Sequence, residues 1–170
     1  MTDPDHSPTP ADLGAATPDA STADARGQPL DAAFIVAWCQ RNGIAYSASD
    51  DGTQVSLPRG DAAPLRIIGH PDRGLATFAL VVAHGLPPER HAAALDICGR
   101  ANARMFYGAW VLNTEIGQLY LRLSVPLNGV SYTDAALRWL VDTTLGTAEA
   151  ILPALRDVLQ DDETTPTTSN

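Results

Sequence analysis

The sequence predicts an α+β domain in which an antiparallel sheet of about five or six strands carries helices on one face. Six short runs of apolar residues, alternating or nearly continuous, lie between turn residues, which is typical of strands. Three other segments repeat apolar residues at helical spacing. The predicted order is helix, four strands, helix, two strands, helix, and the short turns between successive strands favour antiparallel pairing.

The folded part is expected to cover residues 30–160. Residues 1–29 contain five prolines among Asp, Ser, Thr and Ala and show no apolar periodicity, and residues 161–170 have a similar character. Segments of this composition bury too little apolar surface to offset the entropy of folding. We therefore expect a disordered acidic arm at 1–29, one domain at 30–160 and a disordered acidic tail at 161–170.

The first half of the domain begins with a helix. Asp31 is a candidate N-cap, and Gly43 is a candidate stop signal at the other end. Four strands are then expected, at residues 44–48, 53–58, 65–70 and 75–83. The pair Asp50 and Asp51 precedes the turn of the first hairpin. The last of the four strands is apolar almost throughout, which favours the centre of the sheet.

The second half contains a helix, a hairpin and a final helix. Pro87 and Pro88 suit the first turn of the helix. Its predicted buried stripe consists of Ala94, Leu95, Cys98, Ala101 and Asn102. The hairpin strands are expected at residues 105–113 and 118–126, with Asn113 opposite Gln118 because this register gives each face a consistent chemistry.

That register divides the hairpin into two faces. The predicted core face consists of Phe106, Gly108, Trp110 and Leu112 opposite Val125, Leu123, Leu121 and Leu119. The second face consists of Met105, Tyr107, Ala109 and Val111 opposite Pro126, Ser124, Arg122 and Tyr120. The second face is too apolar for an ordinary solvated surface, which makes it a candidate contact surface.

The final helix is expected from Tyr132 to Gln160, capped by Thr133 or Ser131. Pro153 is expected to kink or divide it. Its apolar stripe consists of Leu137, Leu140, Val141, Leu145, Ala148, Ile151, Leu152, Leu155 and Leu159. Trp139 falls roughly opposite this stripe, beside Ala135, Thr143, Gly146 and Ala150. Small residues beside a tryptophan allow another backbone to approach closely.

Charge and composition exclude several classes of function. The net charge is -9, but residues 1–29 carry five Asp and one Arg and the tail three acids, so the core carries only -2. Acidic ends disfavour nucleic acid, which needs clustered positive charge. The chain contains no lysine. Schiff-base enzymes, Walker-type phosphate loops and protein-kinase ATP sites all need a lysine amine, so these classes are excluded.

The sequence favours a cytoplasmic location. Cys39 and Cys98 lie far apart on apolar helix faces without a CxxC motif, and reduced buried thiols suit the cytosol. No signal-peptide pattern precedes the predicted fold. The longest apolar run, LATFALVVA, is about half of what a membrane-spanning helix requires. We therefore expect no membrane partner.

With these elements placed, the chain resembles the YbjN family of bacterial sensory transduction regulators, whose fold resembles class I type III secretion chaperones. The likeness is strongest over residues 94–159, where ALDICGRANARMFYGAWVLNTEIGQLYLRLSVPLNG resembles the family's helix ending near an Asn, here Asn102, and the hairpin that follows. The late PALRDVL resembles the family's ending. Over residues 30–84 the match lies mainly in the order of the elements. The resemblance implies a non-enzymatic, often dimeric domain without a cofactor that binds other proteins, and it provides no catalytic residues.

The four histidines do not form a metal-binding or catalytic pattern. They are His6, His70, His84 and His91, and none of their spacings matches HExxH or HxxxH. No GxSxG, GxGxxG or paired-carboxylate motif is present either. We therefore predict no catalytic, metal-binding or cofactor-binding residues.

Three sets of residues are candidates for protein contacts. The first, on the second hairpin face, consists of Tyr107, Ala109, Val111, Tyr120 and Arg122. The alternative is that the chain's own arm or a neighbouring helix covers this face. The second set, on the final helix, consists of Trp139, Gly146 and Ala150, which meet a second copy or a partner helix. The alternative is that Trp139 packs on the first helix of the same chain.

The third set, on one edge of the second helix, consists of Arg90, Arg100 and Arg104. These arginines form a solvated edge or attract an acidic segment, including the protein's own arm. The sequence as a whole predicts a non-enzymatic protein-binding module, chaperone-like or regulatory, that acts as a homodimer with an unidentified protein partner. The alternative is a small-molecule sensor or enzyme with a pocket between sheet and helices.

Overall fold

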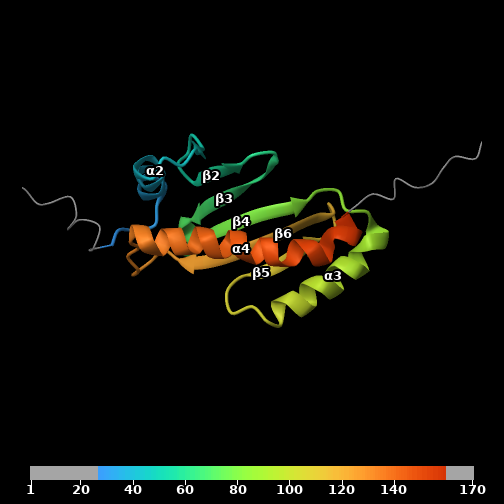
Figure 1. The fold of residues 1–170 in the computed structure, drawn as a ribbon. Helices are drawn as coiled ribbons and strands as arrows, with labels where there is room; N and C mark the ends of the chain where they lie inside the picture. The colour runs from blue at the N-terminus through green and yellow to red at the C-terminus, as the bar shows by residue number, and fades with distance from the viewer. Residues whose placement is uncertain (1–26, 160–170) are drawn as a thin grey trace, which may run out of the picture.

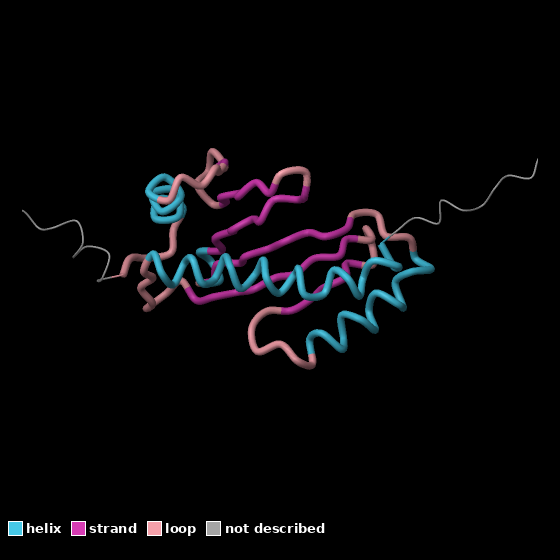
Figure 2. Tube along the Cα trace, in the orientation of Figure 1, coloured by secondary structure: helices cyan, strands magenta, loops and turns pink. Residues whose placement is uncertain are grey.

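The computed structural model describes residues 27–159, and the predictions made for residues 1–26 and 160–170 lie outside it. Figure 1 shows the elements as a ribbon, and Figure 2 traces the same view by secondary structure. In chain order the elements are α2 (Ala32–Arg41), β1 (Ser47–Ala48), β2 (Gln54–Arg59), β3 (Ala62–His70), the 3-10 turn η2 (Pro71–Arg73), β4 (Leu75–Ala83), α3 (Pro88–Asn102), β5 (Ala109–Asn113), β6 (Gln118–Pro126) and α4 (Asp134–Leu159).

The strands form one antiparallel sheet in the order β1-β2-β3-β4-β6-β5. The predicted fold class and order of elements are confirmed, and the apolar strand β4 lies inside the sheet, between β3 and β6. Buried residues of all three helices share one core with the inner sheet face. Figure 1 shows α4 lying across the sheet, with α3 beside its C-terminal half. The opposite sheet face is left without a covering helix among residues 27–159.

The predicted helix caps are present. The Asp31 carboxylate accepts a hydrogen bond from the backbone N–H of Phe34 at 2.8 Å. The Thr133 hydroxyl accepts from the N–H of Ala136 at 3.2 Å, so Thr133 caps α4. Each bond satisfies one of the backbone donors left over at a helix start and stabilises the helix by about 1 kcal/mol.

The register of the last hairpin is the predicted one. Asn113 lies opposite Gln118, and Trp110 lies opposite Leu121 with both side chains buried. The C-terminal residue of α3 fixes the position of this hairpin. The Asn102 side chain accepts from the N–H of Trp110 at 2.7 Å and donates to the Trp110 carbonyl at 3.0 Å. A single side chain therefore joins α3 to the sheet edge.

The first strand of that hairpin is shorter than predicted. It begins at Ala109 instead of residue 105, and Phe106, expected on the core face, is 96% exposed. Gly108 explains the difference, because its φ of 81° turns the chain away from the sheet. A Cβ at Gly108 would lie 2.5 Å from the Arg122 carbonyl oxygen, so only glycine allows this close approach.

Two smaller predictions were wrong. The strand expected at 44–48 is reduced to Ser47–Ala48, because Ile44 and Tyr46 pack against the core instead of pairing. Leu95 is 48% exposed, because α3 is covered only on the side of its three buried residues, Ala94, Cys98 and Ala101.

Pro153 does not divide α4, which is one continuous helix. A proline at this position removes the hydrogen bond to the carbonyl of the residue four positions earlier. That residue, Glu149, is exposed, so water can replace the missing donor.

Candidate functional site

The predicted contact residues divide between two surfaces on opposite sides of the sheet. Four of them, Ala109, Val111, Tyr120 and Arg122, lie on β5 and β6 and face away from the helices. The others lie on the helix side. The structure thus separates Tyr107 from the hairpin face on which the alternating pattern placed it.

We call the first surface the open sheet face. Its outward residues on β3, β4, β6 and β5 stand in rows that the register fixes, Arg66–Ala79–Arg122–Ala109 and Val81–Tyr120–Val111. The two arginines are exposed, whereas the remaining five side chains are half-buried by their neighbours. The open sheet face therefore combines an apolar row with a row that carries two exposed arginines.

The second surface begins with an aromatic cluster, formed by Phe106, Tyr107 and Trp139. The rings of Tyr107 and Trp139 meet edge to face, with centroids 5.6 Å apart and planes at 89°. Even so, Tyr107 is 62% exposed and Trp139 49% exposed. The cluster borders a hollow of about 410 Å³ over β6 and the start of α4. The described aromatic partner of Trp139 is Tyr107, in the loop between α3 and β5. The predicted alternative, packing of Trp139 on α2, stays a prediction.

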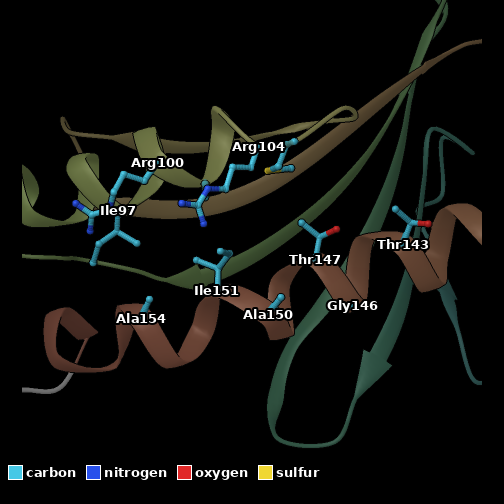
Figure 3. Close-up of a pocket in the computed structure, with 11 residues that line it drawn as sticks. Ile97, Arg100, Arg104, Thr143, Gly146, Thr147, Ala150, Ile151 and Ala154 are labelled. Carbon is cyan, nitrogen blue, oxygen red and sulfur yellow. The ribbon is translucent and has the colours of Figure 1, made fainter.

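The aromatic cluster continues into a groove between α3 and α4, which we call the α3–α4 groove. Met105 follows α3 and borders Phe106, while Thr143 lies one helical turn beyond Trp139. The groove encloses about 620 Å³, and Figure 3 shows its lining. The lining residues are Ile97, Arg100, Ala101, Arg104, Met105, Thr143, Gly146, Thr147, Ala150, Ile151 and Ala154. We refer to the cluster and the groove together as the helix-side strip.

The walls of the groove are apolar and mostly small. Gly146 and Ala150 are exposed on α4, and no atom lies within 4 Å of the position that a Cβ on Gly146 would take. Ala101 and Ile151 form part of the floor and belong to or touch the main core. A second backbone could therefore approach α4 closely, as the predicted pattern of small residues beside Trp139 suggested.

The three arginines predicted as one stripe have different surroundings. Arg90 donates to the carbonyl of Val158 at 3.2 Å and thereby joins the start of α3 to the end of α4. Arg100 forms an exposed ion pair with Asp96, one turn earlier on α3. The Arg104 side chain has no hydrogen bond or ion pair with any other residue in 27–159, and Figure 3 shows its guanidinium directed toward α4. Arg100 and Arg104 thus place positive charge at one wall of an apolar groove.

Two of the described histidines form hydrogen bonds within the fold. The His91 ring lies 2.8 Å from the Leu86 carbonyl oxygen, and the His84 ring lies 3.2 Å from the Gln118 amide. Within residues 27–159 no three His, Cys, Asp or Glu side chains come together as metal ligands. Burial raises the pKa of the Cys39 and Cys98 thiols, which keeps both of them protonated at neutral pH.

Asp51 has the turn role that the sequence predicted. Its carboxylate accepts hydrogen bonds from the Ser49 hydroxyl at 2.6 Å and from the N–H and hydroxyl of Thr53 at 3.0 and 2.8 Å. These bonds, the one from Ser49 first, lower the pKa of this exposed carboxyl.

The pattern of apolar residues missed Phe106 as a surface residue and placed Met105 on the opposite side of the sheet from the groove that it lines. Both were assigned to a strand because the alternation runs unbroken from residue 105 to 113. One signal for the actual arrangement was available. Gly108 interrupts the alternating run, and a glycine inside a strand pattern often marks a bend or a close backbone approach.

The sequence matches the family model of YbjN, described as "Putative bacterial sensory transduction regulator", over residues 31–157. The chain belongs to the YbjN family. The match covers all the helices except the last two residues of α4, so the whole described fold belongs to one family unit. No curated protein matches the chain significantly. Among residues 27–159, no helix is both long and apolar enough to cross a membrane.

One solved structure shows the same fold, and two others align less well. YbjN from E. coli, described as a putative transcription regulator, aligns with a TM-score of 0.59 at 12% identity, covering 74% of this chain and 90% of that one. The ExoU–SpcU complex of the Pseudomonas aeruginosa type III secretion system gives a TM-score of 0.46 at 20% identity, with 74% and 98% covered. The HopA1–SchA chaperone–effector complex gives 0.43 at 14% identity, with 84% and 98% covered. At these identities the first of the three likenesses shows the fold alone.

Proposed function

We propose that this YbjN-family chain is a non-enzymatic protein-binding module, chaperone-like or regulatory, that acts as a homodimer. The observation that carries the proposal is the helix-side strip, where three exposed aromatic side chains continue into an apolar groove of about 620 Å³. Large aromatic residues next to arginine are the side chains that dominate binding energy in protein interfaces.

The shape of the strip suits a segment of another protein. The part of α4 from Thr143 to Ala154 is about 16 Å long at 1.5 Å per residue, enough for about three turns of a partner helix or five residues of an extended chain. The small residues of α4 permit close approach, and the aromatic cluster supplies an anchor at one end. An apolar segment with a terminal hydrophobic side chain would bury both the small residues of α4 and the aromatic cluster.

The open sheet face supports the homodimer. Five half-buried side chains lie there without a covering helix in residues 27–159, and flat sheet faces pack against one another about 10 Å apart. Arg66 and Arg122 would repel their copies in a directly superposed arrangement. An offset that places each arginine beside the partner's tyrosine would remove the repulsion and add a cation–π contact.

The second candidate function is a small-molecule sensor that uses the space between α2 and the sheet. A hollow of about 280 Å³ lies there, lined by Ile35, Val55 and Ile67 among others. Its two carboxylates, Asp31 and Asp51, are already engaged in the α2 cap and the hairpin turn. A thermal-shift screen with metabolites tests this function, because a ligand that binds only the folded protein raises its melting temperature.

Aspartate substitutions in the full chain test the protein-binding proposal. Trp139→Asp together with Tyr107→Asp should reduce partner capture by about 30-fold, since two central aromatic contacts contribute about 2 kcal/mol or more. Ile116→Asp is the matched control, because Ile116 is 58% exposed but lies in the β5–β6 turn, outside the strip. Quantitative mass spectrometry of proteins captured from the native cytosol gives the readout.

Light scattering tests the homodimer separately. The unsubstituted chain should have about twice its 17.9 kDa mass, and Tyr120→Asp should return it to the monomer mass. If the double variant captures as much partner as the Ile116→Asp control, the proposed partner site is refuted. If Tyr120→Asp leaves the mass of the protein unchanged, the proposed homodimer contact is refuted.

A further inference from the structure

We propose that the N-terminal arm binds in cis in the α3–α4 groove, with Leu13 on the apolar floor and Asp12 paired with Arg104. This inference rests on the proposed function in so far as it treats the groove as a binding surface, and it adds an internal competitor for that surface. The arm would have to leave the groove before a partner could enter.

The groove defines the chemistry of its occupant. Apolar and small side chains make up most of its lining, so the occupant must present an apolar side chain. Arg100 and Arg104 stand at the α3 wall, and Arg104 has no acidic partner in residues 27–159. A guanidinium beside apolar surface is less well hydrated than one in open water, which strengthens its attraction for a carboxylate. The occupant therefore carries an acid next to a large apolar residue.

The arm contains one internal pair of this kind. Within residues 1–26, Met1 and Leu13 are the only large apolar residues, and Leu13 directly follows Asp12. The same segment carries five Asp and one Arg, so its charge is opposite to that of the groove wall. The sequence from residue 160 to 170, QDDETTPTTSN, is acidic but contains no large apolar side chain. Charge and apolar content together favour the arm over the tail.

The point at which the arm joins the domain also favours the groove. Gln28 and Tyr132 exchange two backbone hydrogen bonds, of 2.8 and 2.7 Å, so the arm joins the domain just before α4 begins. Thr143 and Ala150 lie about 14 and 24 Å along α4 from Asp134 at 1.5 Å per residue. A chain of the length from Leu13 to Gln28 extends to about 50 Å at most and spans about 20 Å on average as a random coil. The most populated span therefore matches the distance to the groove.

Attachment makes a weak contact sufficient. A tethered segment sees its site at an effective concentration in the millimolar range. A contact with a dissociation constant of about 1 mM, which one leucine and one ion pair can supply, would therefore hold the arm in the groove about half of the time or more. Such a contact is also weak enough for a partner to displace.

Disulfide trapping in the full chain tests this arrangement. Ala16→Cys combined with Thr143→Cys places one thiol on the arm and one at the near end of the groove. The matched control is Ala16→Cys with Asp72→Cys, because Asp72 is exposed on η2 and follows Pro71, which lines the same hollow as Leu30 near the base of the arm. Cys39 and Cys98 are 0% and 3% exposed and contribute little background.

The groove pair should form an intramolecular disulfide about tenfold faster than the control pair, which corresponds to about 1.4 kcal/mol of preference. Adding Leu13→Ser or Arg104→Glu should bring the two rates together, and raising the salt concentration should narrow the difference. Equal rates without these additions would overturn the proposal. Covalent dimers in place of the intramolecular product would overturn it as well, since they show that the groove takes the arm of a second copy.

The trapping experiment and the partner-capture experiment can fail independently of each other. Partner capture depends on Trp139 and Tyr107, neither of which is changed in the trapping experiment. Slow trapping with intact partner capture would remove the arm contact alone. Rapid trapping with partner capture that is indifferent to Trp139→Asp and Tyr107→Asp would keep the arm contact and remove the proposed partner site.

Discussion

The helix-side strip and the open sheet face have similar compositions but different shapes. Each combines two arginines with aromatic and small apolar residues. On the sheet face the side chains stand in rows and half-bury one another, whereas on the helix side Phe106, Tyr107 and Trp139 project beside a concave groove. A flat face can pack against its own copy, while a groove requires a narrower, convex partner. Composition alone therefore does not distinguish the two kinds of contact.

Gly108 separates the two surfaces, and Gly108→Ala should have the largest effect. Alanine at a φ of 81° costs about 1–2 kcal/mol, and its Cβ would meet the Arg122 carbonyl oxygen at 2.5 Å. We expect a loss of about 2–4 kcal/mol in the free energy of unfolding, measured by urea denaturation.

Gly99→Ala is the matched control for that substitution. Gly99 lies in α3 with open space around its Cβ position. Alanine there should leave stability unchanged or raise it by up to about 1 kcal/mol, because it restricts the unfolded chain and favours the helix. Equal effects of the two substitutions would show that Gly108 does not impose the turn that divides the surfaces.

The aromatic cluster should give a smaller effect. A double-mutant cycle with Tyr107→Ala and Trp139→Ala should yield a coupling of about 0.5 kcal/mol, at the lower end for edge-to-face pairs because both rings are half-exposed or more. Tyr120→Ala with Trp139→Ala provides the uncoupled comparison across the sheet. A coupling of zero for the first pair would mean that the strip is not preorganised.

Alkaline pH should give the smallest effect per residue, through side chains buried in the core beneath the helices. Burial raises the pKa of Cys39, Cys98 and Tyr132 in the folded state, so the unfolded state loses these protons first. Their contribution to stability is complete below the pKa of the unfolded groups and is lost as the pH rises through the folded pKa values. Near pH 9 the loss should be about 0.4 kcal/mol for each thiol at most.

Urea denaturation at pH 7.5 and pH 9 measures this loss. The variant carrying Cys39→Ala and Cys98→Ala should show a flatter dependence of stability on pH over the same interval, because the two buried thiols are removed. Stability that rises from pH 7.5 to pH 9 in the unsubstituted chain would contradict the assignment of both thiols to the buried core.

Much of the fold could be predicted because local patterns and tertiary contacts agree. The caps of Asp31 and Thr133 need only a side-chain oxygen and a free N–H nearby in sequence. The hairpin register followed from face chemistry, since a shift by one residue would bury Arg122 in place of Leu121. These local constraints leave few alternative helix starts and strand registers.

The surfaces were harder to predict because they arise from contacts distant in sequence. The alternation of residues 105–113 correctly marked a strand but did not reveal that Gly108 meets the backbone of β6. The helical pattern grouped Arg90, Arg100 and Arg104, but Arg104 lies past the end of α3 at Asn102. The position of α4 decides that Arg100 and Arg104 line the groove, whereas Arg90 reaches the C-terminal end of α4. A helical pattern predicts on which face of its own helix a side chain lies, but it does not predict which element packs against that face.

The Asn102 side chain has a consequence for the edge of the sheet. β5 is the last strand of the sheet, and Asn102 takes both the N–H and the carbonyl of Trp110 on the side facing away from β6. An incoming strand would need those same two groups to start a ladder. The Asn102 amide therefore blocks strand addition at this point of the sheet edge. This favours association through side-chain surfaces over open-ended polymerisation through backbone hydrogen bonds.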